Sequence, residues 1–326
     1  MSINNRKLKF SLAINEAITQ KMATDDSVIL IGQGVKSPWY VGNTCTGLIE
    51  KFGESRVIDT PVSENAITGA AVGAAIAGMK AIVVHPRVDF ALYAFDPIIN
   101  QAANWHYMNG GKSSAPVVFW LIVNRGGEQG AQHSQALHSL FAHIPGLKVV
   151  TPSTAYDAKG LMIAAINDPN PVVFIDDRWL YRFDEIVPEE IYEVPIGKGI
   201  IRKEGTDVTL VSFSYMAQES IIAANELEKE GISVELVDPR SIKPLDSEII
   251  INSVKKTGRI VVAEGAWKFG SVSAEIIAQV SENFAALKAP AKRVCLPDAP
   301  APASGTLEKE YYPTSKNIVA EIKKMF

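Results

Sequence analysis

Unbroken apolar runs alternate with helix-like segments along the first half of the chain. Five of these runs are predicted strands, at residues 28–31, 81–84, 116–123, 148–150 and 172–175. Strands of a parallel sheet are covered by helices on both faces, so they are apolar throughout instead of alternating with polar residues. The pattern over residues 8–176 therefore predicts an α/β domain with a mostly parallel sheet flanked by helices.

A second block of the same kind begins at residue 207. Its predicted strands are 208–211, 233–237 and 259–263, and its predicted helices are 217–230, 245–256 and 271–284. Between the two blocks, residues 178–205 are charged and contain prolines and glycines without a strong period, which is typical of a linker. The sequence therefore predicts two α/β domains, residues 1–190 and residues 191–326.

The densest group of polar residues lies at 59–65, immediately before a predicted helix at 66–79. That helix is rich in alanine and glycine and is apolar almost all round, so we expect it to be buried on every side. Glu64 would lie at its start, where Ser63 could cap the helix and the helix dipole would stabilise the carboxylate. Alternatively, the helix sinks Glu64 into the interior, where desolvation lets the carboxyl group share a proton with a ring nitrogen. The residues alone leave both interpretations open.

A glycine-rich loop at 124–135 follows the predicted strand at 116–123 and contains His133. Loops at strand ends are where α/β folds place ligands. An imidazole titrates near neutral pH, so His133 is a candidate for acid/base chemistry, although many loop histidines are simply solvated.

Composition narrows the possible functions. The 326 residues include 32 basic and 36 acidic ones, for a formal net charge of −4, and no basic stripe of the kind that nucleic-acid binding requires. No apolar run approaches the ~20 residues that a membrane-spanning helix needs. The first nine residues lack the apolar run and cleavage site of a secretory signal, which predicts a cytoplasmic protein. Cys45 and Cys295 lie far apart and lack metal-ligand spacing.

Two of these segments carry a resemblance to a known family. Asp59-Thr60-Pro61-Val62-Ser63-Glu64, with the glycines and alanines of 69–78, and the Gln-His-Ser-Gln run at 132–135 resemble signatures of β subunits of thiamin-diphosphate-dependent 2-oxo acid dehydrogenases. Residues 95–111, 167–171, 237–246, 264–271 and 302–308 extend the likeness over nearly the whole chain. The resemblance implies a transketolase-like pyrimidine-binding domain followed by a transketolase C-terminal-like domain that is mainly an assembly surface.

The resemblance also implies roles for individual residues. Glu64 would contact the aminopyrimidine ring of thiamin diphosphate and drive formation of its imino tautomer. His133 would contact the cofactor-bound intermediate and help to transfer the acyl group to lipoamide. Phe90 would pack against the aminopyrimidine, with an ordinary core phenylalanine as the alternative, and Gln33 would also lie against the cofactor.

The family's cofactors and partners follow from the same resemblance. The chain has no "GDG" motif of the kind that marks a diphosphate-binding domain, so Mg²⁺ and the diphosphate would be held by an α subunit. The expected assembly is an α2β2 heterotetramer with β–β contacts, together with a lipoyl acyltransferase as a further partner. Asp168 and Asn170 resemble a loop that binds K⁺ in several relatives, although a plain turn would have the same composition.

The chain departs from the family pattern at two places. Gln33 and Gly34 replace the usual acidic residues, and Arg87 stands where relatives carry acidic and aromatic residues. Arg87 could bind a carboxylate or phosphate of the substrate with its forked guanidinium, or it could pair with Asp89.

These departures leave three functions to weigh. We expect a 2-oxo acid dehydrogenase β subunit, with the small subunit of a split transketolase-like enzyme acting on sugar phosphates as the alternative. A regulatory subunit without turnover is a third possibility, but the retention of both Glu64 and His133 argues against it.

Overall fold

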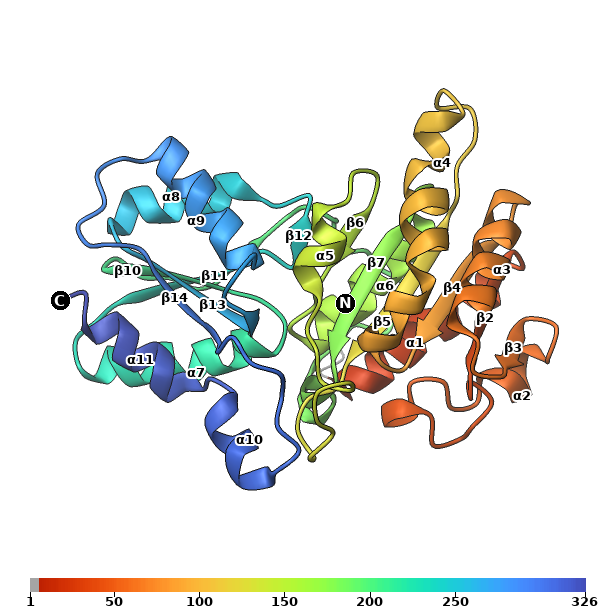
Figure 1. The fold of residues 1–326 in the computed structure, drawn as a ribbon, viewed down its shortest axis with the longest axis horizontal. Coiled ribbons are helices and arrows are strands. Elements are labelled where there is room, and N and C mark those ends of the chain that lie inside the picture. Colours follow the sequence, from red (N-terminus) through yellow and green to blue (C-terminus); the bar gives the residue numbers. More distant parts are fainter. Residues whose placement is uncertain (1–5) are drawn as a thin grey trace.

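The structure is a computed structural model that describes residues 6–326. It contains two α/β sheets of seven and five strands with helices on both faces, which confirms the predicted fold class (Figure 1). Residues 1–5, which contributed to the prediction of a cytoplasmic protein, lie outside the described residues. Within residues 6–326, no helix is both long enough and apolar enough to cross a membrane.

The first sheet is parallel except at one edge. In spatial order its strands are β12 (Ser241–Lys243), β6 (Lys148–Val150), β7 (Val172–Asp177), β5 (Val117–Val123), β4 (Lys80–His85), β2 (Val28–Gln33) and β3 (Val57–Thr60). All the predicted strands of this half are present, and every residue of β5 is buried, as a strand covered on both faces requires. The antiparallel edge strand, β12, comes from the second half of the chain and pairs with β6.

The second sheet also has one antiparallel edge. Its strands, in spatial order, are β14 (Lys292–Leu296), β13 (Ile260–Trp267), β10 (Val208–Ser212), β11 (Val234–Asp238) and β9 (Ile200–Lys203). β9 pairs antiparallel with β11 and lies inside the segment predicted as linker. All four residues of β9 are half-buried, so its sequence lacks the apolar run that identified the other strands. The stretch of this segment without a helix or strand is 187–199.

Helices divide the interior into two apolar cores, one on each face of the sheets, and each core is continuous across both sheets. The first core is formed mainly by α1 (Phe10–Thr24), α6 (Ala155–Asn167), α7 (Tyr215–Lys229) and α11 (Ser315–Lys323). The second is formed mainly by α3 (Glu64–Ile76), η2 (Val88–Ala94), η3 (Asp96–Ala102), α4 (Ala103–Met108), α5 (His138–His143), α8 (Ser247–Thr257) and α9 (Val272–Asn283). The two halves of the chain therefore share their interior.

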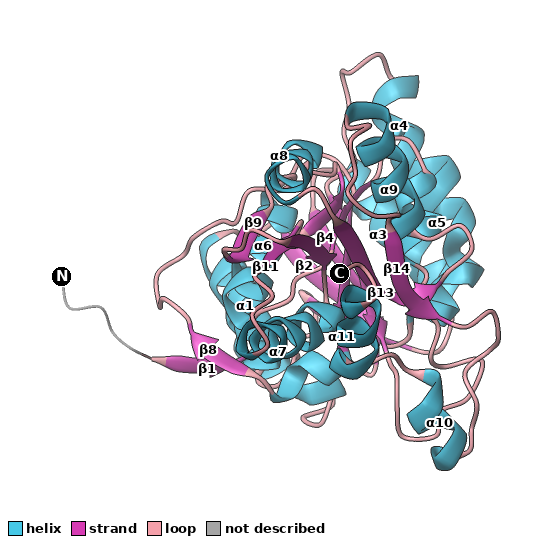
Figure 2. Ribbon diagram, turned by 90° about the vertical axis from the view of Figure 1, so that its left-hand side faces the viewer, coloured by secondary structure: helices cyan, strands magenta, loops and turns pink. Residues whose placement is uncertain are grey.

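The remaining elements are short. They are β1 (Lys7–Lys9), η1 (Val41–Asn43), α2 (Leu48–Phe52), η4 (Arg178–Arg182), β8 (Asp184–Ile186) and α10 (Gly305–Tyr311). β1 and β8 form a separate antiparallel ribbon, which Figure 2 shows beside the main sheets.

The prediction that the alanine- and glycine-rich helix is buried on every side is wrong. In α3, Ile67, Thr68, Ala71, Val72 and Ala75 are buried against the sheet. The opposite face, which carries Asn65, Ala66, Gly69, Ala70 and Gly73, is exposed. Composition alone could not reveal this, because no other described element of the chain covers that side.

Two adjacent carboxylates, Asp176 and Asp177, end β7 and are fully buried. Asp176 accepts hydrogen bonds from Trp120 Nε1 (3.2 Å) and Tyr181 Oη (2.7 Å). Burial outweighs these bonds and raises the pKa of Asp176 to about 7. The folded chain therefore keeps a proton on Asp176 at pH values at which the unfolded chain has released it.

We predict that Asp176→Asn removes a pH-dependent part of the free energy of unfolding. A pKa raised by folding contributes stability that is complete below the unfolded pKa, ordinarily 3.8 for Asp176, and is lost as pH rises through the folded pKa of about 7. Between about pH 5 and about pH 8, the wild-type chain should lose about 2–3 kcal/mol relative to the variant. Urea unfolding of both chains over this range measures the difference.

The comparison is internally controlled because the other buried groups with shifted pKa values are common to both chains. Burial raises the pKa of Glu264 to about 7 and lowers that of His85 to about 4. A difference in unfolding free energy that stayed constant from acid to neutral pH would contradict the prediction.

Candidate active site

The predicted site residues other than Asp168 and Asn170 lie at one edge of the first sheet. β3, β2, β4 and β5 are adjacent and parallel, so their carboxyl ends share that edge. Gln33 ends β2, Glu64 follows β3, Phe90 follows β4 and His133 follows β5. The strand order changes direction between β2 and β4, and such a switch point is where open α/β sheets bind ligands.

Glu64 is the first residue of α3 and is partly exposed. It borders a shallow, open depression of about 440 Å³, together with Ser63, Asn65, Ala66 and Tyr93. The side chain of Ser63 makes no capping hydrogen bond, so the simple capping interpretation fails. The described chain does not bury Glu64 either, so any desolvation of its carboxylate has to come from a ligand or a partner.

Phe90 and His133 are brought together. Their ring centroids are 5.3 Å apart and their planes are nearly perpendicular, an edge-to-face contact. Both side chains remain partly exposed, so the pair presents an aromatic surface at the sheet edge.

Asp89 lies beside Phe90 and His133. The sequence had indicated it only as a partner for Arg87. It is buried, and its Oδ1 accepts a hydrogen bond from the backbone N–H of Gln135 (3.2 Å). Burial raises the pKa of Asp89, while this hydrogen bond and the nearby His133 act in the opposite direction. Asp89 therefore ties the short helix η2 to the loop that carries His133.

Arg87 is half-buried and does not form the predicted alternative ion pair with Asp89 within residues 6–326. Its Nη1 donates to the carbonyl of Pro86 (2.8 Å) and its Nη2 to Gln129 Oε1 (3.4 Å), while its Nε is buried without a hydrogen-bond partner in that range. Burial and the charge of Arg178 both lower the pKa of Arg87. Two guanidinium groups near each other favour an anionic ligand.

Unpartnered polar atoms also lie beside Gln33. Thr60 is paired in register with Gln33 at the ends of β3 and β2. In the part of the chain that the structure describes, Asp59 Oδ1 and Thr60 Oγ1 are buried without a hydrogen-bond partner. Buried polar atoms generally have partners, so these atoms indicate room for a polar ligand or a solvent molecule at this end of the sheet.

Asp168 and Asn170 lie before β7, at the opposite edge of the sheet from the other predicted residues. Asp168 ion-pairs with Lys148 and accepts a hydrogen bond from the backbone N–H of Asn170 (2.9 Å). Asn170 Oδ1 is buried and free of protein partners over residues 6–326, but the ammonium group of Lys148 already neutralises the carboxylate. Within residues 6–326, Asn170 Oδ1 is therefore the one side-chain oxygen of this pair that is left without a partner, and K⁺ binding at this loop stays a prediction.

Across residues 6–326, no three His, Cys, Asp or Glu side chains are grouped so that they could hold a metal ion.

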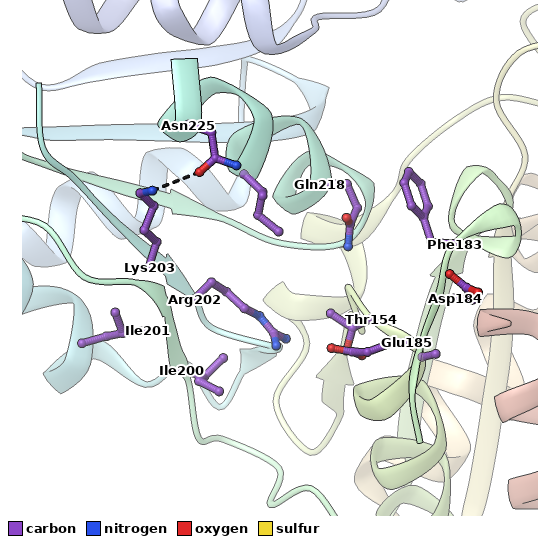
Figure 3. Close-up of a pocket in the computed structure, with 12 residues that line it drawn as sticks. Thr154, Phe183, Asp184, Glu185, Ile200, Ile201, Arg202, Lys203, Gln218 and Asn225 are labelled. Carbon is purple, nitrogen blue, oxygen red and sulfur yellow. Dashed lines mark hydrogen bonds between the residues drawn. The ribbon is translucent and has the colours of Figure 1, made fainter. Parts of the chain in front are cut away.

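Two cavities between the domains are separate from this edge. One, of about 560 Å³, is lined by Arg202, Lys203 and Gln218 among others (Figure 3). Arg202 ion-pairs with Asp157 and Asp238, and Lys203 donates to Asn225, so both cations have protein partners. The second, of about 970 Å³, lies between α5 and α9. None of the predicted site residues lines either cavity.

Two protein-family models match the chain, one in each half. Residues 6–184 match the transketolase pyrimidine binding domain, and residues 197–318 match the transketolase C-terminal domain.

Curated relatives match over almost their whole length. A β subunit of acetoin:2,6-dichlorophenolindophenol oxidoreductase from Cupriavidus necator is 46% identical over 98% of this chain and 97% of its own. The pyruvate dehydrogenase E1 component β subunit of Rickettsia felis is 42% identical over 96% of both chains. The β subunit of the acetoin oxidoreductase of Bacillus subtilis is 40% identical over 97% of this chain and 96% of its own.

A solved structure has the same fold. It is described as a split gene transketolase in an inactive β4 tetramer, and it matches 98% of each chain with a TM-score of 0.79 at 24% identity.

Proposed function

The chain belongs to the transketolase-like family that includes the β subunits of pyruvate dehydrogenase and acetoin dehydrogenase, and from this we propose that it supplies the pyrimidine-facing half of a thiamin-diphosphate site. The observation that carries the proposal is the convergence of a carboxylate, an aromatic–histidine pair and two arginines at the switch point of one sheet. The enzyme would cleave a 2-oxo compound and pass the acyl group to lipoamide.

The residues at this edge fit the pyrimidine half of the cofactor. When bound, thiamin diphosphate would supply a thiazolium ring whose acidic carbon, once deprotonated, can add to a carbonyl group and whose cationic nitrogen can take up the electron pair released by bond cleavage. Glu64 would hold a proton at a ring nitrogen of the aminopyrimidine, and Phe90 would pack against that ring. Gln33 would offer its amide where family members have an acid. The unpartnered atoms of Asp59 and Thr60 beside Gln33 support a polar ligand there.

His133 and Arg87 would face the substrate side. His133, fixed by its contact with Phe90, would donate or accept a proton near the reacting carbonyl group. Arg87 and Arg178 would attract the carboxylate of a 2-oxo acid, because neither guanidinium forms an ion pair within residues 6–326. We therefore propose an anionic 2-oxo acid as the substrate.

A neutral substrate is the second candidate. The relative from Cupriavidus necator is named for acetoin, which carries no charge, and it is 46% identical to this chain. The alternative of a split transketolase acting on sugar phosphates has a solved counterpart, but a likeness at 24% identity supports the fold alone.

The partner that completes the site would be an α subunit in an α2β2 heterotetramer, carrying Mg²⁺ and the diphosphate. The partly exposed Glu64, the exposed Tyr93 and the uncovered face of α3 lie on the side that such a subunit would cover. Contacts between β subunits, a lipoyl acyltransferase as a further partner and a cytoplasmic location belong to the same proposal.

We predict that the purified chain alone binds thiamin diphosphate weakly and turns over no substrate, because the diphosphate half of the site lies on the partner. Isothermal titration calorimetry with thiamin diphosphate, with and without Mg²⁺, measures this. Tight, Mg²⁺-dependent binding by the isolated chain would contradict the prediction.

We predict that Glu64→Gln in the assembled enzyme slows exchange of the cofactor's thiazolium proton by ~100-fold or more. The amide keeps the size of the side chain but cannot share a proton with the aminopyrimidine. Proton exchange followed by NMR is the measurement, and Glu54→Gln, the same change at an exposed turn residue, is the matched control. Wild-type exchange in Glu64→Gln would refute the assignment.

We predict that Arg87→Ala lowers kcat/KM for pyruvate roughly 10-fold or more relative to acetoin, because a charge-assisted contact to a carboxylate is lost. Arg87→Lys should recover part of this preference because it restores the charge without the fork. Steady-state kinetics with both substrates, together with sizing of the complex, measure the effect. An unchanged pyruvate-to-acetoin ratio with impaired assembly would show that Arg87 is structural.

A further inference from the structure

The loop that carries His133 is held in a strained backbone conformation. Glu128, five residues before His133, has a φ of 60°. This left-handed region costs a residue with a side chain roughly 1 kcal/mol, so it persists only where other contacts compensate. Those contacts come from the C-terminal domain.

Glu128 exchanges hydrogen bonds with α10, which lies beside the loop (Figure 1). Its backbone N–H donates to both carboxylate oxygens of Glu308 (3.3 and 3.2 Å), and its own carboxylate accepts from the backbone N–H of Gly305 (2.8 Å). A Cβ on Gly305 would lie 2.6 Å from Glu128 Oε1, so a larger residue there would force this carboxylate to move. Glu308 is buried, so its carboxylate depends on such donors.

Both domains hold the start of the loop. Arg125 is buried, with its Nε 2.6 Å from Asp177 Oδ2. Its guanidinium lies 5.8 Å from the ring centre of Trp179 and 5.7 Å from that of Tyr312. A Cβ on Gly265 would lie 2.5 Å from Arg125 Nη1, so the C-terminal domain closes directly over this side chain.

We infer that Glu308, together with Gly305, is a positioning clamp that sets the conformation of the 124–135 loop and so places His133 beside Phe90. Neither residue reaches the reacting atoms, and their effect passes through Glu128. The catalytic consequence rests on the role proposed for His133, whereas the effect on the loop does not. The C-terminal domain thus contributes to the site as well as to assembly.

Removal of the Glu308 carboxylate would leave the N–H of Glu128 without its acceptor and its backbone strain without compensation. The loop would then sample other conformations, and His133 would lose its fixed place. Glu64 begins α3 and Gln33 ends β2, outside the 124–135 loop, so binding on the pyrimidine side would be unaffected. The expected signature is a lower kcat for acyl transfer with an unchanged affinity for thiamin diphosphate.

The test compares Glu308→Ala with Glu310→Ala in the enzyme assembled with its α subunit. Glu310 is an exposed residue of the same helix, so the second variant controls for loss of a glutamate from α10. Hydrogen–deuterium exchange of the peptide covering 126–135 is measured alongside kcat, KM and cofactor affinity. For Glu308→Ala we expect exchange roughly 10-fold faster or more and kcat lower by roughly 10-fold or more, with Glu310→Ala like wild type.

Two further variants keep the test decisive if Glu308→Ala does not fold. Glu308→Gln retains a carbonyl acceptor and should recover most of the protection of the 126–135 peptide from exchange. Glu128→Gly tolerates the positive φ but loses the contact to Gly305, so it should speed exchange of this peptide.

Unchanged exchange of the peptide in Glu308→Ala, or in Glu128→Gly where Glu308→Ala does not fold, overturns the clamp whatever the activity. Faster exchange with unchanged kcat overturns its positioning role. If the wild-type enzyme acts on no 2-oxo compound, the proposed function fails, while exchange still judges the clamp.

Discussion

Parallel pairing of β3, β2, β4 and β5 is the constraint on which the site depends. Strands that run in the same direction must end at the same edge, so four loops far apart in sequence are gathered there regardless of their own composition. The helices that return the chain between strands also bury both faces of the sheet. Glu64, Phe90 and His133 are therefore brought to one edge by the strands, and the segments that follow β4 and β5 are linked there by the Phe90–His133 contact and by the Asp89–Gln135 and Arg87–Gln129 hydrogen bonds.

Burial decides which parts of the fold could be predicted from the sequence. β5 is buried over its whole length and reads as one apolar run, so its position was predicted to within one residue. β9 and β12 lie at sheet edges, are only four and three residues long, and include half-buried positions, so neither carries an apolar run long enough to distinguish it from a loop. The face of α3 was misjudged for a related reason: an apolar composition shows that a surface tends to be covered, but not that the same chain covers it.

The residues of the candidate site were proposed from motifs, whereas the contacts that support them in the structure were not predicted. Glu64 and His133 stand within short sequence patterns, but Glu128 and Glu308 meet across 180 residues and neither belongs to a pattern that suggests a partner. Arg87 shows the opposite case. It lies two residues from Asp89 in the sequence, which suggested an ion pair, but in the structure its guanidinium instead contacts Pro86 and Gln129. Contacts between distant segments are set by how the domains pack, and that packing has no local signature.

Under the proposed function, assembly and activation are coupled because this chain supplies only half of the site. The face of α3 exposes alanine and glycine, which allow another backbone to approach closely, and Glu64 lies at the start of the same helix with its carboxylate partly in water. A subunit that covers this face would remove apolar surface from water and desolvate Glu64 in the same step. Under the proposed function, association of the two subunits would thus also put the Glu64 carboxylate in surroundings where it can share a proton with the aminopyrimidine ring. An isolated chain would hold the correct residues in the correct loops and still lack the environment that makes them reactive.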